Sequence, residues 1–224
     1  MRGELTAKGK ATRSRIIEGA AAVLRENGVA STTLDDIMAR TSTSKSQLFH
    51  YFPAGKDELL VAVAQFEADQ VLEDQQPYLG CLDSWEAWGQ WRDVVIKRYE
   101  AQGDQCPLGS LFHQIGRSTP GTRAIVIELM RRWQESLAQG IRALQAAGEL
   151  PASLDVDMRA AALLAAIQGG VSILLSTGQS IHLRAALDQG ISDLRRTGRT
   201  NASAGDDGDG GATAVDIEHD AVHE

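Results

Sequence analysis

Four polar side chains in one short stretch have the types and spacing to hydrogen-bond with the edges of nucleic-acid bases. They are Lys45, Ser46, Gln47 and His50. On a helix these side chains point outward, because Leu48 and Phe52, four residues apart, occupy the inner side. A short helix with a polar outer face fits a major groove, where a glutamine can form two hydrogen bonds with adenine. These four residues are therefore the candidates for base contacts.

Two short helices joined by a tight turn are predicted to hold this surface. Thr33 can cap the first helix with Asp36, the turn falls at 41–43, and Ser44 with Gln47 forms a second capping pair. Hydroxyl and ammonium groups near these helices are candidates for phosphate contacts: Thr33, Ser44, Tyr51 and Lys56. Lys56 begins a third helix, whose N-terminus also favours anions. In the alternative interpretation, Ser44 is only a cap and Tyr51 only packs.

This stretch resembles the tetracycline-repressor (TetR) family of bacterial regulators. The matching residues are Thr32-Thr33-Leu34, Asp36-Ile37, Ser44-Lys45, Leu48-Phe49-His50-Tyr51-Phe52 and Lys56-Asp57-Glu58-Leu59. The resemblance covers about residues 12–66, and the remainder is similar only in architecture. Ser42 replaces the usual turn glycine, and Phe49 replaces a tyrosine, so we expect Phe49 to contribute packing only. Cys106-Pro107-Leu108-Gly109 is similar to a segment found in a subgroup of drug- and flavonoid-responsive repressors.

Charge is divided unevenly along the 224 residues. Residues 1–56 hold 9 Lys and Arg against 5 Asp and Glu, residues 57–224 hold 13 against 25, and the total is -8. A cationic head on an acidic body indicates that only the head meets a polyanion. We expect a cytoplasmic protein outside the membrane, because the N-terminus lacks a signal-peptide pattern and the longest apolar stretch, 160–175, is shorter than a bilayer span of about 20 residues.

Helix breakers at helical intervals, without period-2 alternation, predict an all-α protein of about nine helices. The expected helices beyond the two short ones are 12–27, 56 to about 77, 84–102, 106–116, 120–147, 155–176 and 181–196. Four segments follow: a flexible basic arm (1–11), a three-helix helix-turn-helix DNA-binding domain (12–55), a helical ligand-binding and dimerisation domain (56–197) and a disordered acidic tail (198–224). We expect no metal site and no cofactor, since His219 and His223 in the tail have no second ligand pair.

The last two predicted helices carry more apolar surface than one chain is expected to bury. Two copies could bury it in a four-helix bundle, where the small residues Gly169 and Gly170 permit close approach. The expected dimer-interface residues are Leu164, Ile167, Val171, Leu174, Leu175, Leu183, Leu187, Ile191 and Leu194. A homodimer would place two recognition helices about 34 to 36 Å apart on palindromic DNA. The alternative is a monomer in which the helix over 155–176 is simply central.

Aromatic and polar side chains in the predicted body suit a small hydrophobic or aromatic ligand. The candidate ligand-binding residues are Phe66, Gln70, Trp85, Trp88, Tyr99, Phe112, His113, Met130, Trp133, Leu137 and Ile167. Core packing is the alternative for any single tryptophan. The family resemblance implies a ligand cavity between the helix that begins at Lys56 and the helix over 155–176.

These patterns favour a ligand-responsive transcriptional regulator. By the family's usual mode it is a repressor that binds a palindromic operator as a dimer and is released by a small hydrophobic or aromatic inducer. Two alternatives stay open: a helical protein-interaction module, and an activator without a small-molecule inducer. An enzyme is disfavoured, because Cys106 and His113 would lie about 10.5 Å apart along one helix, too far for a catalytic thiolate pair.

Overall fold

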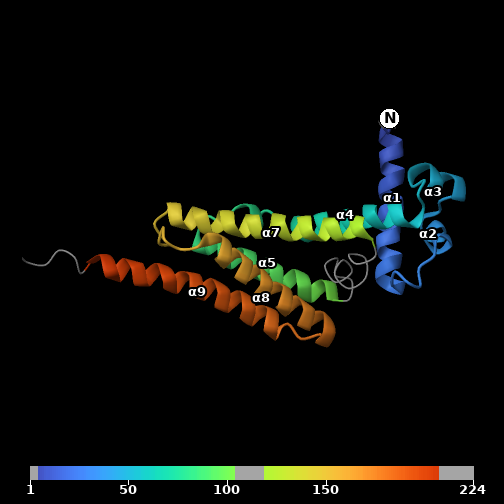
Figure 1. Cartoon of the computed structure of the whole chain (residues 1–224). Coiled ribbons are helices and arrows are strands. Elements are labelled where there is room, and N and C mark those ends of the chain that lie inside the picture. The colour runs from blue at the N-terminus through green and yellow to red at the C-terminus, as the bar shows by residue number, and fades with distance from the viewer. Residues whose placement is uncertain (1–4, 104–118, 207–224) are drawn as a thin grey trace, which may run out of the picture.

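The computed structural model describes residues 5–103 and 119–206, and throughout these ranges the chain is helical with connecting turns (Figure 1). The helices are α1 (Ala7–Asn27), α2 (Leu34–Thr41), α3 (Lys45–Tyr51), α4 (Lys56–Glu73), α5 (Trp85–Gln102), α7 (Pro120–Ala146), α8 (Val156–Thr177) and α9 (Ile181–Asp206), with a short 3-10 helix, η1 (Tyr78–Gly80). The predicted all-α class is confirmed. The helix expected over 106–116 lies outside the described residues.

A small head is built from α1, α2 and α3 at one end of an elongated body (Figure 1). α1 begins at Ala7, five residues before the expected start, because the Thr6 side chain accepts a hydrogen bond from the Gly9 amide at 3.2 Å. The predicted basic arm over 1–11 is therefore wrong from Ala7 onward. Lys8 and Lys10 stand on a helix and extend the basic face of the head.

α4 is the connection between head and body. Its first turns pack on α1, and it then runs alongside α7 into the body (Figure 1). Burial follows the helical period on this element, with Leu59, Leu60, Val63 and Ala64 all inside the core. α4 ends at Glu73, earlier than the end near Pro77 that the sequence suggested.

α8 is the central helix of the body, packed between α7 and α9. A Cβ placed on Gly170 would lie 2.6 Å from the Leu183 Cα, so the α8 and α9 backbones approach each other more closely than an alanine would allow. By length and composition alone α8 could cross a membrane, a test that the core helix of a soluble protein also passes. Its packing on two neighbours identifies it as a core helix.

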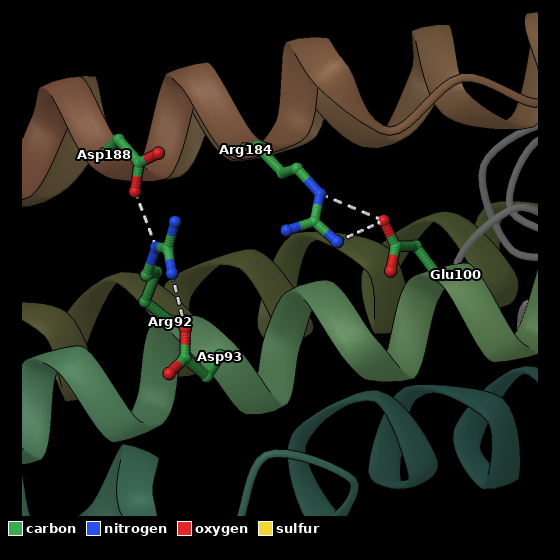
Figure 2. Close-up of polar contacts among 5 residues, drawn as sticks. All are labelled: Arg92, Asp93, Glu100, Arg184 and Asp188. Carbon is green, nitrogen blue, oxygen red and sulfur yellow. Dashed lines mark hydrogen bonds and ion pairs between the residues drawn. The ribbon is translucent and has the colours of Figure 1, made fainter.

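A polar seam joins α9 to α5 (Figure 2). Arg184 donates to the Glu100 carboxylate at 2.7 Å, and Arg92 donates through Nε to Asp188 at 2.5 Å. A hydrogen bond from Ser180 lowers the pKa of Glu100 most, and the hydrogen bond from Arg184 lowers it further. These pairs fix which side of α9 faces the body.

α9 continues to Asp206 and not to the expected end near Arg196. The glycine at 198 does not stop the helix because it packs closely: a Cβ there would lie 2.2 Å from the Glu149 carbonyl oxygen. The expectation of disorder from residue 198 is therefore wrong as far as Asp206, and residues 207–224 lie outside the described ranges.

Candidate nucleic-acid interface and body site

The cap of α2 forms as predicted and fixes the entrance to the head. Thr33 Oγ1 accepts from the Asp36 amide at 3.2 Å, and Asp36 accepts from the Thr33 amide at 2.8 Å and from the Thr33 hydroxyl at 2.7 Å. The hydrogen bonds from the Thr33 side chain and backbone lower the pKa of Asp36. Because its hydroxyl proton is engaged, Thr33 has no side-chain donor left for a phosphate.

The turn after α2 carries the strained residue that the sequence suggested. Ser42 has φ 49° and ψ 45°, in the left-handed region where glycine is favoured. Thr41 and Thr43 on either side are buried, and the Thr41 hydroxyl donates to the Ile37 carbonyl at 2.7 Å. These buried hydroxyls hold the turn and set the angle between α2 and α3.

α3 exposes the four predicted base-contact side chains. Lys45, Ser46, Gln47 and His50 are all exposed, whereas Leu48 and Phe52 are fully buried. Arg13 of α1 lies 5.2 Å from the centre of the Phe52 ring and covers it from the other side. The recognition face is therefore a polar surface standing on a fixed apolar base.

Ser44 and Tyr51 flank this face in different ways. The Ser44 hydroxyl oxygen accepts from the Gln47 amide at 3.2 Å, so the hydroxyl can still donate to a phosphate oxygen. Tyr51 is half-buried, and its ring meets the His50 ring edge-on at a centroid distance of 4.9 Å. The hydroxyl of Ser44 can therefore serve both as cap and as contact.

Phe49 is more exposed than expected. With 38% of its surface accessible it stands beside Gly55, so part of its ring is free of packing contacts, and the expectation that it contributes packing only stays a prediction. An exposed aromatic ring next to base-reading residues can contact a thymine methyl group. The sequence could have indicated this exposure, because Phe49 lies next to the outward-facing His50 and does not share the four-residue spacing of the buried Leu48 and Phe52.

Lys56 holds the head together from inside. Its ammonium donates to the carbonyls of Thr32 at 2.6 Å and Val29 at 2.9 Å, and the side chain is half-buried. These bonds tie the start of α4 to the loop between α1 and α2. Two of its three donors are thus engaged, so Lys56 acts first as a structural clamp and not as the phosphate contact that we expected.

A buried ion pair joins the head to α4. Arg25 in the last turn of α1 donates to Glu67, whose side chain has no exposed surface. Burial raises the pKa of the Glu67 carboxyl, while the neighbouring Arg25 acts in the opposite direction. Within the described part of the chain, Arg25 Nε and Glu67 Oε2 have no partner. Neither residue is a candidate on the sequence pattern alone, because the two lie 42 positions apart along the chain.

Two of the body tryptophans are satisfied core residues. Trp88 donates to the Leu82 carbonyl at 3.1 Å, and Trp91 donates to the Gln75 side chain at 3.0 Å. Their rings meet edge-on at 5.6 Å, and both are fully buried. Trp88 was predicted to bind ligand, but its donor is engaged and its ring is part of the core.

Two other buried donors have no acceptor within the described residues: Trp133 Nε1 on α7 and Gln168 Nε2 on α8. The exposed Arg142–Asp157 ion pair at 3.0 Å joins these antiparallel helices and gives an approximate register between them. Counting from that pair brings Trp133 level with Ala166, so Gln168 is about 3 Å away along the axis. Two unpaired donors therefore occur at nearly the same level of the bundle.

Several predicted ligand residues lie at this level. The Arg132–Asp69 ion pair at 3.0 Å joins α4 to α7 at the residues that precede the candidates Gln70 and Trp133 in the sequence. One turn or less away are Phe66, Met130, Leu137 and Ile167, of which the last two are fully buried. α7 packs on both α4 and α8, so the candidates on these three helices lie around α7.

The remaining ligand candidates are separate from this group. Tyr99 lines a small cleft with Val71 and Gln75, whose volume of about 10 Å³ suits one water molecule. Trp85 is half-exposed at the far end of the body, where it donates to Glu149 at 2.9 Å and stacks under Arg195. Its assignment to an internal site is therefore wrong. Phe112 and His113 lie outside the described residues.

Most of the expected dimer-interface residues are buried within one chain. Leu164, Ile167, Val171, Leu174, Leu183, Leu187, Ile191 and Leu194 are each less than 10% exposed, and Leu175 is half-buried. They have little surface left to offer a partner, which corrects the expectation that one chain cannot bury them. Gly170 likewise serves the α8–α9 contact inside the chain.

The opposite side of α8 is the surface that remains open. Ala162, Ala166, Gly169 and Ile173 are exposed at helical spacing, and a Cβ on Gly169 would meet no atom within 4 Å. An open groove of about 270 Å³ runs between this side of α8 and α9. Its floor includes Leu163 and Gly190, where the two helices cross closely.

Comparison with known proteins gives matches along both parts of the chain. Residues 16–63 match the family described as bacterial regulatory proteins, tetR family, and residues 85–206 match the tetracyclin repressor-like C-terminal domain. A curated relative is the HTH-type transcriptional regulator SrpR of Pseudomonas putida, 29% identical over 162 residues, which span 70% of this chain and 72% of SrpR.

Solved structures share the fold. A TetR regulator from Chloroflexus aurantiacus superposes with a TM-score of 0.70 at 24% identity, covering 84% of this chain and 96% of that one. The SmeT–triclosan complex superposes with a TM-score of 0.66 at 20% identity, covering 82% and 91%. SmeT is the repressor of a Stenotrophomonas maltophilia multidrug efflux pump.

Proposed function

Because the chain belongs to the tetR family of bacterial regulatory proteins, whose members are transcriptional regulators and not enzymes, we propose that it is a repressor that a small aromatic ligand releases from DNA. In this proposal it binds a palindromic operator as a homodimer in the cytoplasm. The observation that carries the proposal is the outward face of α3, whose exposed hydrogen-bonding side chains stand on a fully buried base.

The DNA contacts divide by chemistry. Lys45, Ser46, Gln47 and His50 reach base edges, and Phe49 adds an apolar contact. Ser44 and Tyr51 flank them at the phosphates, with the basic residues of α1 alongside. Lys56 supports the head from within through its two carbonyl bonds.

The dimer face that we propose is the open side of α8 and α9. Small residues at 162, 166 and 169 allow two helices to approach closely, as in a four-helix bundle of two α8–α9 hairpins. The groove between the helices would receive side chains of the second copy. This surface replaces the buried leucines that the sequence had suggested.

The inducer site that we propose lies where Trp133 and Gln168 present unpaired donors. A buried donor without an acceptor is unfavourable, so a ligand with an oxygen acceptor would gain from filling this position. The surrounding candidates Phe66, Gln70 and Met130 would provide apolar contact area. Triclosan, the ligand in the SmeT complex, has this character, with aromatic rings and oxygen acceptors, and it supports an aromatic ligand here.

Release follows from linkage between the two sites. A ligand shifts DNA affinity only by its different affinity for the DNA-binding arrangement and the alternative one. α4 borders the ligand level at Gln70 and begins in the head at Lys56, so it is the element whose position both sites can bias. A coupling of about 1 to 3 kcal/mol is typical of such regulators.

A gel-shift experiment tests the DNA-binding part. The full chain should bind duplex DNA from the region upstream of its own gene in competition with random duplex, and Gln47→Ala should weaken specific binding by about 1 to 3 kcal/mol. Failure of the wild-type protein to bind any promoter duplex at low salt would favour the protein-interaction alternative. Binding that increases transcription in a reporter assay would favour the activator.

A pair of tryptophan variants tests the ligand site. A thermal-shift screen of planar aromatic compounds supplies the ligand. Trp133→Phe should then weaken its binding about fivefold, because one hydrogen bond of about 1 kcal/mol is lost. Trp91→Phe is the control, since its donor already pairs with Gln75 and not with ligand. Equal ligand affinity in wild type and Trp133→Phe would remove Trp133 from the site.

The oligomeric state tests the proposed dimer face. Ala166→Glu places a charge on the open side of α8 and should convert dimer to monomer in sedimentation experiments. Ala124→Glu, on an exposed position of α7, is the matched control and should leave the dimer intact. An Ala166→Glu protein that remains dimeric would show that the chains meet elsewhere.

A further inference from the structure

Beyond the Lys56 clamp at the start of α4, an ion pair between charged side chains joins α1 to α4 in an otherwise apolar setting. Arg25 of α1 and Glu67 of α4 form an ion pair, and the neighbouring residues Ala21 and Ala64, one turn away, and Ala68, next in the sequence, are buried and apolar. Alanine contacts tolerate sliding of one helix on another. A buried ion pair does not, because any shift that breaks it leaves an uncompensated charge away from water.

The pair is poorly arranged for stability alone. Glu67 is fully buried, yet one of its oxygens and the Arg25 Nε have no partner within the described residues. A half-satisfied polar contact in a core is less favourable than an apolar one, and buried ionic contacts can instead specify one arrangement among several. The Arg25–Glu67 pair is therefore better suited to selecting one angle between α1 and α4 than to adding stability.

We propose that Arg25 and Glu67 are positioning residues that fix the angle of the reading head on α4 and, in the dimer, the spacing of the two heads. The inference rests on the proposed dimeric DNA binding. α2 packs on α1, so α3 follows whatever angle α1 adopts against α4. Because two heads must meet sites about 34 to 36 Å apart, a small change of this angle alters which half-site spacing is bound best.

The test is a spacing profile. An operator is selected by the wild-type protein from random duplex DNA, and its central spacer is then lengthened or shortened by one and two base pairs. Affinity is measured for each spacing and for a single half-site. Glu67→Gln keeps the shape of the side chain and removes its charge, and Arg25→Lys keeps the charge and removes the guanidinium geometry. Asp69→Asn, which removes an exposed charge from the same helix, is the control.

Wild type and Asp69→Asn should prefer the selected spacing sharply. In Glu67→Gln the preference over altered spacings should fall about five- to tenfold, the lower part of the range typical of coupled sites, with half-site affinity unchanged. Arg25→Lys should act in the same direction, and it serves as the test if Glu67→Gln does not fold.

The inference is overturned if either folded variant keeps the wild-type profile, or loses affinity equally at every spacing. If the wild-type protein binds no duplex, the proposed function fails before the joint is tested. The two failures are thus distinguished by the wild-type measurement.

Discussion

Two lysines that were both predicted to meet DNA have different surroundings in the structure. Lys45 is exposed at the start of α3, whereas the Lys56 ammonium bonds to two backbone carbonyls. The exposure and the hydrogen bonds of a lysine side chain, and not its charge, therefore decide whether it is free to contact DNA or holds the fold together.

We predict that Lys45→Ala lowers the salt dependence of operator binding by about one unit of slope, because the Lys45 ammonium, besides reaching a base edge, neutralises one neighbouring phosphate and releases its counterion. Lys56→Met should leave the slope unchanged and destabilise the protein by about 1 to 3 kcal/mol, since two carbonyls lose their partner. Titration of operator at several salt concentrations, with urea unfolding alongside, measures both. An unchanged slope in Lys45→Ala would place its ammonium away from the phosphates.

Residue-scale features set by near neighbours were predictable. The Thr33 cap, the Ser44 cap and the turn at Ser42 each depend on residues within a few positions along the chain. The clamp of Lys56 onto Val29 and Thr32 was not predictable, because those carbonyls lie more than twenty residues away. The Arg25–Glu67 pair was missed for the same reason.

At the scale of the element, α8 shows where helical pattern stops being informative. It is apolar around most of its circumference, so no period in the sequence tells which side faces α7, α9 or a second chain. The buried leucines were therefore assigned to the wrong neighbour. Trp85 of α5 was misplaced for a similar reason. Its surroundings depend on α9, and the α9 residue that contacts it, Arg195, is more than a hundred positions away in the sequence.

Two adjacent glycines on α8 give a matched prediction. Gly170→Ala should lower the free energy of unfolding by about 1 to 3 kcal/mol, because its Cβ would press on the Leu183 backbone, which cannot move aside. Within the single chain, Gly169→Ala should not destabilise the fold, because nothing in the same chain lies near its Cβ and alanine favours helix; any effect through the proposed dimer face would depend on protein concentration. Urea denaturation of both variants gives the comparison. Equal destabilisation would contradict the α8–α9 packing.

At the scale of the whole molecule, the pH dependence of stability reports the joint between head and body. Burial raises the pKa of Glu67 above its ordinary value of 4.5, with Arg25 opposing and Asp74 reinforcing the shift. Between pH 4.5 and the raised pKa, the Glu67 carboxyl is therefore more protonated in the folded state than in the unfolded state. Stability must fall as pH rises through this window.

We therefore predict that Glu67→Gln becomes more stable relative to wild type as the pH rises from 4.5. This gain in unfolding free energy should level off above the raised pKa of Glu67. Chemical denaturation at a series of pH values measures it. Glu128→Gln is the control: Arg131 lowers the pKa of Glu128, so its contribution changes below 4.5 and is lost as the pH falls. A pH-independent difference for Glu67→Gln would mean that this carboxyl titrates as it does in the unfolded chain.

The uneven charge along the long axis has one more consequence. With an excess of cations at the head end and an excess of anions on the described part of the body, each molecule is an electric dipole. In the field around a duplex it experiences a torque that turns the head forward before contact, while the acidic body is repelled from any second duplex nearby. We therefore expect this charge distribution to favour contact with one duplex at a time and to oppose the bridging of two.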